Sequence, residues 1–213
     1  MKVGVLGSGD VAKTLAGGFL KHGHSVKVGS RNPAKLADWA SQTQGGTVGT
    51  FDEAAAFGEL VVLAVKGKAA ADALTLAGLK NLAGKTVIDA CNPIEDAPPE
   101  KGVLRFFTDI NLSLMETLQS QFPDAHFVKA YNSVGVPCMI NPKFEGGRPT
   151  MFICGNDESA KKQLAAINEQ FGWETADMGT VEAARAIEPL CMLWCIPGFK
   201  HNDWTHAFKM LTK

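Results

Sequence analysis

Hydrophobic residues follow two alternating spacings along the chain. Short runs rich in β-branched residues are separated by segments in which apolar residues recur every three to four positions. The short runs have the length of buried strands, and the longer segments have the period of helices. Because this alternation continues almost to the end of the chain, it predicts stacked βαβ units on a mostly parallel sheet.

Individual elements follow from the same pattern. The predicted strands cover residues 2–6, 25–29, 47–48, 60–65, 86–90, 126–131, 150–154 and 174–178. The first helix has an apolar stripe over residues 11–20 and ends near Gly23, a residue type that suits a helix C-terminus. The Asn32-Pro33 pair predicts a second helix that reaches about residue 41. Further helices are expected over residues 109–122, where Ile110 and Leu114 share a face, and 157–171.

Two segments depart from the alternation. Residues 92–108 are rich in proline and charge and show no clear period, and loops of that length are usually functional or disordered. We interpret this loop as a wall or lid of a site. Residues 180–213 are predicted to be helical with a break at Pro197-Gly198. We therefore expect one domain over residues 1–179 and a short C-terminal helical extension over residues 180–213.

Composition excludes several classes of protein. The 213 residues are 46% hydrophobic and carry 21 Lys and Arg against 22 Asp and Glu, so the net charge is −1. Such a chain is too apolar for intrinsic disorder and has no excess of positive charge for nucleic acid. The longest aliphatic run, residues 60–65, is far shorter than a membrane helix. We expect a cytoplasmic protein with no membrane or nucleic-acid partner.

The cysteines and the N-terminus agree with that location. Five cysteines, with no Cys-x-x-Cys pair, fit reduced thiols better than disulfides or a structural zinc site. Gly7 and Asp10 interrupt the first apolar stretch at once, so the start of the chain lacks the pattern of a signal peptide.

A glycine motif follows the first predicted strand. The sequence Gly7-Ser8-Gly9-Asp10-Val11-Ala12 fits G-x-G-x-x-[GA] and opens a helix inside a βαβ unit, as in a doubly wound Rossmann-type fold. Gly7 permits the tight turn, Gly9 lets a pyrophosphate approach the backbone, and Ala12 lets the helix pack on the sheet. Free N–H groups at the helix start then bind the anion. The alternative is an ordinary turn without a ligand.

The end of the second strand indicates which dinucleotide binds. An NAD enzyme places an acidic residue there to bind the ribose, but this chain has Gly29 followed by Ser30 and Arg31. Ser30, Arg31 and Lys35 can bind a 2′-phosphate instead, and Lys35 lies where a cation disfavours the helix start unless an anion is present. This pattern favours NADP(H). The alternative is two solvated surface cations.

Three further loops complete the predicted site at the carboxyl ends of the strands. They contain Val65 and Lys66, Asn92, and residues 132–136, which include Asn132, Val134 and Val136. Asn92 and Asn132 suit a carboxamide or ring carbonyl, and they suit the capping of turns equally well. We expect no metal site and no dedicated catalytic side chain, because the chain has no G-x-S-x-G motif and no histidine pair with ligand spacing.

These residues resemble a known family over nearly the whole chain. The glycine motif, residues 28–32 with Lys35, the run from Val128 to Asn132 and residues 153–157 are similar to the NADPH-dependent reductases of coenzyme F420, a deazaflavin. Residues 128–132, 153–157 and 177–179 also resemble the cytosolic reductase domain of six-transmembrane metalloreductases, which bind NADPH and a flavin.

The resemblance implies an NADP(H) site at residues 8–11, Ser30, Arg31 and Lys35, with the nicotinamide near Val65 and residues 132–136. It implies a homodimer with C-terminal helices at the interface. The expected activity is hydride transfer between NADP(H) and a small-molecule acceptor, either coenzyme F420 or a flavin such as FMN or FAD. Two alternatives stay open: a non-catalytic module that senses the NADPH/NADP ratio, and a reductase of small imines or hydroxy acids.

Overall fold

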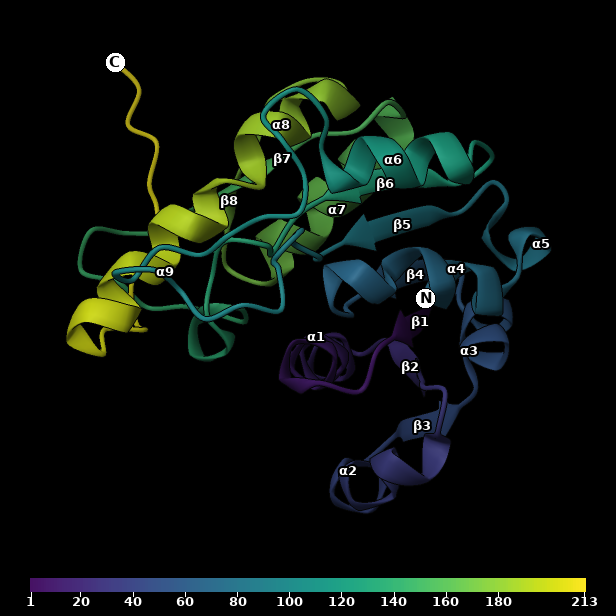
Figure 1. Cartoon of the computed structure of the whole chain (residues 1–213). Coiled ribbons are helices and arrows are strands. Elements are labelled where there is room, and N and C mark those ends of the chain that lie inside the picture. Colours follow the sequence, from purple (N-terminus) through teal and green to yellow (C-terminus); the bar gives the residue numbers. More distant parts are fainter.

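Six parallel strands form the main sheet of the protein. The computed structural model describes residues 1–213 and gives the strand order β3-β2-β1-β4-β5-β6 (Figure 1). These strands are β1 (Lys2–Leu6), β2 (Ser25–Gly29), β3 (Gly46–Gly49), β4 (Leu60–Leu63), β5 (Thr86–Asp89) and β6 (His126–Lys129). The order runs outward from β1 on one side and from β4 on the other, which is the doubly wound arrangement that the sequence predicts. Loops diverge between β1 and β4, so a ligand crevice forms at their carboxyl ends.

The two remaining strands form a separate short sheet. Strands β7 (Thr150–Ile153) and β8 (Glu174–Asp177) pair in parallel. One antiparallel bridge between Lys129 and Cys154 joins this pair to the edge of the main sheet. All eight predicted strands are therefore present, and the sheet as a whole is mostly parallel.

Helices cover both faces of the main sheet. One hydrophobic core contains residues of α1 (Asp10–Lys21) and α7 (Glu158–Gln170), and the other contains residues of α3 (Phe51–Phe57), α4 (Ala70–Ala77) and α6 (Leu114–Gln121). Strand β4 serves both cores, because Leu60 and Val62 belong to the first and Val61 and Leu63 to the second. Burial on both faces explains why β4 is a continuous apolar run. Two short helices complete the connections along the chain: α2 (Ala37–Gln42) between β2 and β3, after a 3₁₀ turn over Pro33–Leu36, and α5 (Leu79–Leu82) between α4 and β5.

Helix α6 begins five residues later than the sequence pattern predicts. The side chain of Asp109 accepts a hydrogen bond from the Asn111 N–H, which holds this segment in a turn. Ser113 then caps α6 and forms a reciprocal capping box with Glu116. Ile110 lies outside the helix and is 81% exposed, so it does not share a buried face with Leu114. The Ser-x-x-Glu spacing was the signal for the true start.

The C-terminal extension also differs from its prediction. It forms a 3₁₀ turn (Val181–Ala183), α8 (Ala184–Ile187) and α9 (Leu190–His201). Helix α9 continues through Pro197, so the predicted break is wrong. Its buried residues Cys191, Trp194 and Cys195 precede the proline and Gly198 follows it, so α9 is packed on both sides of Pro197. Residues 202–213 are not helical, and one backbone hydrogen bond joins them to β7: the Phe208 oxygen accepts from the Thr150 N–H.

The loop between β5 and α6 contains no helix, as its composition predicts. It has isolated antiparallel bridges, one of which joins Ile94 to Phe106. Figure 1 shows this teal segment leaving the sheet, passing beside α9 and returning to α6. Ile94 and Phe106 pack against the buried cysteines and tryptophan of α9. No helix in the structure has both the length and the apolar character needed to cross a bilayer.

Candidate functional site

A pocket of about 610 Å³ lies at the carboxyl ends of β1, β2, β4 and β5. Most of the predicted site residues line it. They are Gly7, Ser8, Gly9, Asp10, Val11, Ser30, Arg31, Lys35, Val65, Lys66 and Asn92. The fold therefore brings together four loops that are far apart in the sequence, at the point where the strand order reverses.

Gly7 is required by the fold around this pocket. Its backbone has φ +143°, and a Cβ at this position would lie 2.2 Å from the Ala64 oxygen and 3.1 Å from the Ala12 Cβ. Its N–H donates to the Gly29 oxygen at 3.0 Å. Gly7 and Ala12 thus allow β1, the loop after β4 and α1 to approach closely.

Gly9 has a different environment. It is the N-cap of α1, with extended backbone, and no side chain caps the helix start. A Cβ on Gly9 would meet no protein atom within 4 Å, although Gly9, Asp10 and Val11 all line the pocket. The first turn of α1 therefore presents uncapped N–H groups and the positive end of a helix dipole to the pocket. This arrangement suits an anion.

The loop after β2 supplies two cations. Arg31 and Lys35 line the pocket, are exposed and form no ion pair. Ser30 is buried, and its Oγ accepts from the Asn32 N–H at 3.2 Å. At Gly29 a Cβ would lie 2.8 Å from both the Ala54 Cβ and the Thr50 oxygen, so an acidic side chain does not fit there. The position that would select NAD is closed to a carboxylate.

Two further charged residues of the pocket, Lys68 and Asp96, were missed by the sequence analysis, which named their neighbour Lys66. Lys66 and Lys68, after β4, each lie 3.5 Å from a carboxylate oxygen of Asp96 on the loop between β5 and α6. Lys68 and Lys66 hold the pKa of Asp96 below its usual value. We call these three residues the strap, because they connect two walls of the pocket. The Lys-x-Lys spacing and the charged loop were the available signals.

The predicted residues of the loop after β6 do not line the pocket. Val134 is buried in the core between the sheet and α1, and Val136 packs against that core. Asn132 is also buried, and its Nδ2 donates to the Asn92 Oδ1 at 3.1 Å and to the Ile187 oxygen at 2.9 Å. Asn132, Val134 and Val136 therefore do not line this pocket, and a cofactor contact at these three residues stays a prediction. Asn132 holds Asn92 by hydrogen bonds on the side away from the pocket.

The lining offers binding groups and few groups for acid–base chemistry. It contains no histidine or cysteine, and its charged side chains are carboxylates, lysine amines and the Arg31 guanidinium. Cys91 lies next to Asn92, but burial and the neighbouring Asp89 raise the pKa of its thiol well above the ordinary value. A thiol of this kind stays protonated and is a poor nucleophile. The pocket can hold and orient a ligand that brings its own reactivity.

Comparisons with known proteins agree with this geometry. Residues 2–93 match the family model for NADP oxidoreductase, coenzyme F420-dependent. A solved structure from Arthrobacter sp. FB24, described as a "putative F420 dependent NADP-reductase", is 31% identical, with a TM-score of 0.93 and complete coverage of both chains.

Two further relatives are informative. Metalloreductase STEAP3 of Rattus norvegicus is 34% identical over 201 residues, which is 92% of this chain and 38% of the metalloreductase. The chain thus spans well under half the length of that relative. An imine reductase from Streptomyces aurantiacus is 17% identical with a TM-score of 0.68, and the match covers 93% of this chain and 63% of the imine reductase. That likeness shows the fold alone.

Proposed function

The chain belongs to the family of coenzyme F420-dependent NADP oxidoreductases, and we propose that it transfers a hydride between NADP(H) and a deazaflavin or flavin-type acceptor. The observation that carries this proposal is the pairing of an uncapped helix start with two cations that lack carboxylate partners. Both features belong to one pocket, on loops that follow neighbouring strands.

The first turn of α1 would hold the pyrophosphate. The open space beside Gly9 admits the phosphates, and the backbone N–H groups of Asp10 and Val11 lie at the positive end of the helix. The carboxylate of Asp10 does not suit an anion, so we assign to Asp10 only its backbone. Arg31 and Lys35 would pair with the 2′-phosphate, with Ser30 as a hydrogen-bond partner.

The reacting end of the pocket would be formed by Val65, Lys66 and Asn92. When bound, NADPH supplies the hydride, and reduction of the acceptor is completed by one proton from solvent. Val65 provides an apolar surface that orients a flat ring and excludes water. The amide of Asn92 is held by Asn132 and so fixes one wall of this end. Proximity and orientation then provide most of the catalysis.

A panel of acceptors tests the proposal. The purified chain is mixed with NADPH and, separately, with F420, FMN, FAD and a ferric chelate with or without flavin. The expected result is loss of the NADPH absorbance with at least one acceptor. Absence of turnover with every acceptor would refute the proposed reaction.

A second function is favoured by the lack of acid–base groups in the lining. A non-catalytic module that senses the NADPH/NADP ratio needs the same nucleotide contacts and no chemistry. Tight NADPH binding without turnover, and a partner protein recovered with only one redox form, would support this alternative.

We also propose that the chain forms a homodimer through α9. Leu193 is 55% exposed and Phe199 is 43% exposed, although both lie on a helix that is apolar on all sides. A helix of this kind is normally covered on more than one face. The C-terminal extension over residues 180–213 would then contact both its own nucleotide domain and the second copy. The buried cysteines form no disulfide, which fits a reducing compartment, so we propose that the dimer is cytoplasmic.

A further inference from the structure

We propose that Lys129 is a positioning residue for the nucleotide site, which it serves by fixing the Cys91-Asn92 wall of the pocket to the C-terminal helices. This inference rests on the proposed function, because it concerns the same pocket. Lys129 does not touch the pocket. It acts through the backbone of Cys91 and through the carboxylates of Asp89 and Glu188, and we call Lys129, Asp89 and Glu188 the buried triad.

The buried triad is enclosed at the carboxyl ends of neighbouring strands. Lys129 ends β6 and is the register partner of Asp89, which ends β5. The Lys129 Nζ lies 2.7 Å from the Asp89 Oδ2 and 2.9 Å from the Glu188 Oε1, and none of the three residues is more than 2% exposed. Burial disfavours the protonated form of the Lys129 amine, but the carboxylates of Asp89 and Glu188 outweigh this effect and raise the pKa of Lys129 above its usual value. The ammonium therefore stays charged at neutral pH.

Two members of the triad hold the residue that precedes the pocket wall. The Asp89 Oδ1 accepts from the Cys91 N–H at 2.9 Å, and the Lys129 Nζ donates to the Cys91 oxygen at 3.0 Å. The next residue, Asn92, lines the pocket and donates from its Nδ2 to the Asn132 oxygen at 2.7 Å. The backbone on both sides of Cys91 is thereby fixed, and Asn92 has little freedom to move.

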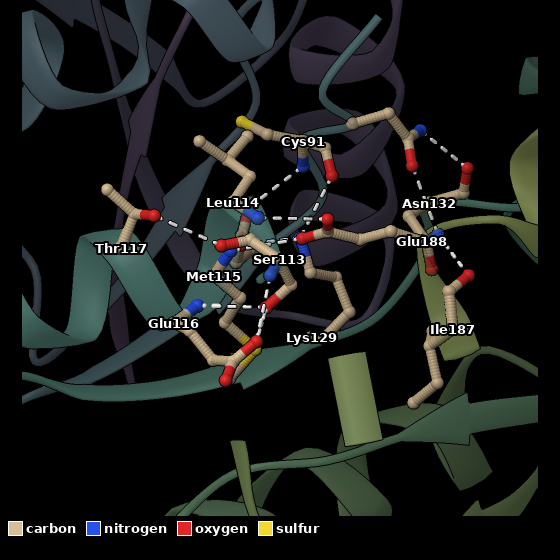
Figure 2. Close-up of polar contacts among 12 residues, drawn as sticks. Cys91, Ser113, Leu114, Met115, Glu116, Thr117, Lys129, Asn132, Ile187 and Glu188 are labelled. Carbon is tan, nitrogen blue, oxygen red and sulfur yellow. Dashed lines mark hydrogen bonds and ion pairs between the residues drawn. The ribbon is translucent and has the colours of Figure 1, made fainter. Parts of the chain in front are cut away.

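The third member ties this wall to the end of the chain. Glu188 lies between α8 and α9, and its carboxylate accepts from the N–H groups of Leu114 and Met115, both at 3.0 Å. Figure 2 shows the Glu188 carboxylate between Lys129 and these first residues of α6. The triad holds two carboxylates and one ammonium, and the positive end of α6 offsets the second negative charge.

Stability alone is a weak reason for this arrangement. Buried ion pairs are costly to desolvate, and apolar residues of similar volume often stabilise a protein equally well. Here the triad acts at a specific place: it connects the pocket wall, the start of α6 and the junction of α8 and α9. Such a connection fixes geometry, and reaction rates fall steeply when reacting groups are displaced by about 1 Å.

The main test uses Lys129→Met combined with Asp89→Asn. This double variant removes one charge of each sign, leaves Glu188 on α6, and keeps an oxygen at position 89 for the Cys91 N–H. We expect kcat to fall about 10–100-fold. Binding of adenosine 2′,5′-bisphosphate, which lacks the nicotinamide, should stay within about twofold, because Arg31 and the start of α1 are untouched. The fluorescence of bound NADPH should change, since the nicotinamide lies against a displaced wall.

A matched control is available elsewhere in the chain. Lys161 is 6% exposed and lies 2.9 Å from the Asp177 Oδ2, while the Asp177 Oδ1 accepts from the Gly179 N–H at 2.9 Å. Like the Lys129–Asp89 pair, this pair joins a buried lysine to an aspartate that accepts from the N–H two residues later, but its aspartate is partly exposed and it lies outside the pocket. Lys161→Met with Asp177→Asn should leave kcat and the fluorescence of bound NADPH unchanged.

Hydrogen exchange of the ligand-free chain gives a readout that needs no nucleotide. Residues 90–96 should exchange faster in the Lys129 double variant and at the normal rate in the Lys161 double variant. Equal exchange of residues 90–96 in both double variants, or an unchanged kcat in the Lys129 variant, would overturn the proposal. Glu188→Gln, which keeps Lys129 and Asp89, is the milder variant if the double variant does not fold, and normal exchange there would equally overturn it. Failure of the unsubstituted chain to bind adenosine 2′,5′-bisphosphate would instead contradict the proposed function.

Discussion

Asn92 and Asn132 exchange two hydrogen bonds: the Asn92 Nδ2 donates to the Asn132 backbone oxygen at 2.7 Å, and the Asn132 Nδ2 donates to the Asn92 Oδ1 at 3.1 Å. Asn92 lines the pocket and Asn132 does not. Asn92 therefore contacts the site, and Asn132 holds Asn92 in place. The sequence alone does not distinguish these two roles.

Replacing Asn132 should affect both stability and turnover. In Asn132→Ala the Asn92 Oδ1 and the Ile187 oxygen lose the Asn132 Nδ2 donor in a buried setting. We expect the free energy of unfolding to fall by about 1–3 kcal/mol. Turnover should fall more than NADPH affinity, because the adenosine half of the pocket is unchanged. Denaturant unfolding and steady-state kinetics measure the two effects, and a loss of affinity alone would argue against a supporting role.

Replacing Arg31 tests the preference for NADP(H). In Arg31→Ala, binding of NADPH should weaken more than binding of NADH by about 1.5–3 kcal/mol, because only NADPH carries the 2′-phosphate. Titration calorimetry with both nucleotides measures the difference. Lys80→Ala removes an exposed cation outside the pocket and is the control. Equal losses for both nucleotides would refute the assignment of Arg31.

The two glycines of the motif should give opposite results. Gly7→Ala should lower the free energy of unfolding by about 1–3 kcal/mol, since the residue has positive φ and its Cβ would collide with Ala64. Gly9→Ala should change stability by less than about 1 kcal/mol, because its Cβ meets no protein atom. NADPH affinity should nevertheless fall at least tenfold in Gly9→Ala, since the added methyl group takes the space of the phosphates. Normal affinity in that variant would place the pyrophosphate elsewhere.

Release of the strap should strengthen binding of anionic ligands. In Asp96→Asn, Lys66 and Lys68 lose their carboxylate partner, so NADPH affinity should rise at low ionic strength. The gain should disappear near 1 M salt, where the Debye length is about 3 Å. Affinity measured across a salt series tests this, and a gain that salt does not reduce would show that charge is not the cause.

The strap also has a predicted pH dependence. Its lysines lower the pKa of Asp96, so the interaction is fully present at neutral pH and is lost only as pH falls through that lowered pKa. Between neutral pH and the ordinary range of an aspartate, the contribution of Asp96 to NADPH affinity should therefore be constant. Comparison of the unsubstituted chain and Asp96→Asn over this range measures it.

The proposed dimer can be broken at one exposed leucine. Leu193→Lys adds a charge to the exposed face of α9 and should convert a dimer to a monomer without unfolding the chain. Light scattering after size exclusion measures the mass, and circular dichroism confirms the fold. Leu76→Lys, at a leucine of similar exposure on α4, is the control and should remain dimeric. A monomeric unsubstituted chain would contradict the proposal directly.

Local patterns in the sequence were enough to predict the doubly wound fold. Buried parallel strands require apolar runs, and the helices between them require a period near 3.6, so both signals are present in the residues themselves. The glycine motif and the absence of an acid after β2 likewise depend on neighbours along the chain. Helix ends were harder to predict. The start of α6 is set by the local capping box of Ser113 and Glu116, whereas the passage of α9 through Pro197 accompanies the packing of its buried residues against the loop between β5 and α6.

The sequence by itself thus determined the doubly wound fold class, the glycine turn after β1 and the two cations after β2, because each arises within one βαβ unit. Only the tertiary structure decided which distant residues meet. Asp89, Lys129 and Glu188 are separated by up to 99 positions and form one buried triad, while Asn132 turns away from the pocket toward Ile187. Charged residues at the ends of two apolar strands indicate that a partner must exist. Which residue is that partner depends on tertiary packing, because two opposite charges can pair in the core only where the fold places them next to each other.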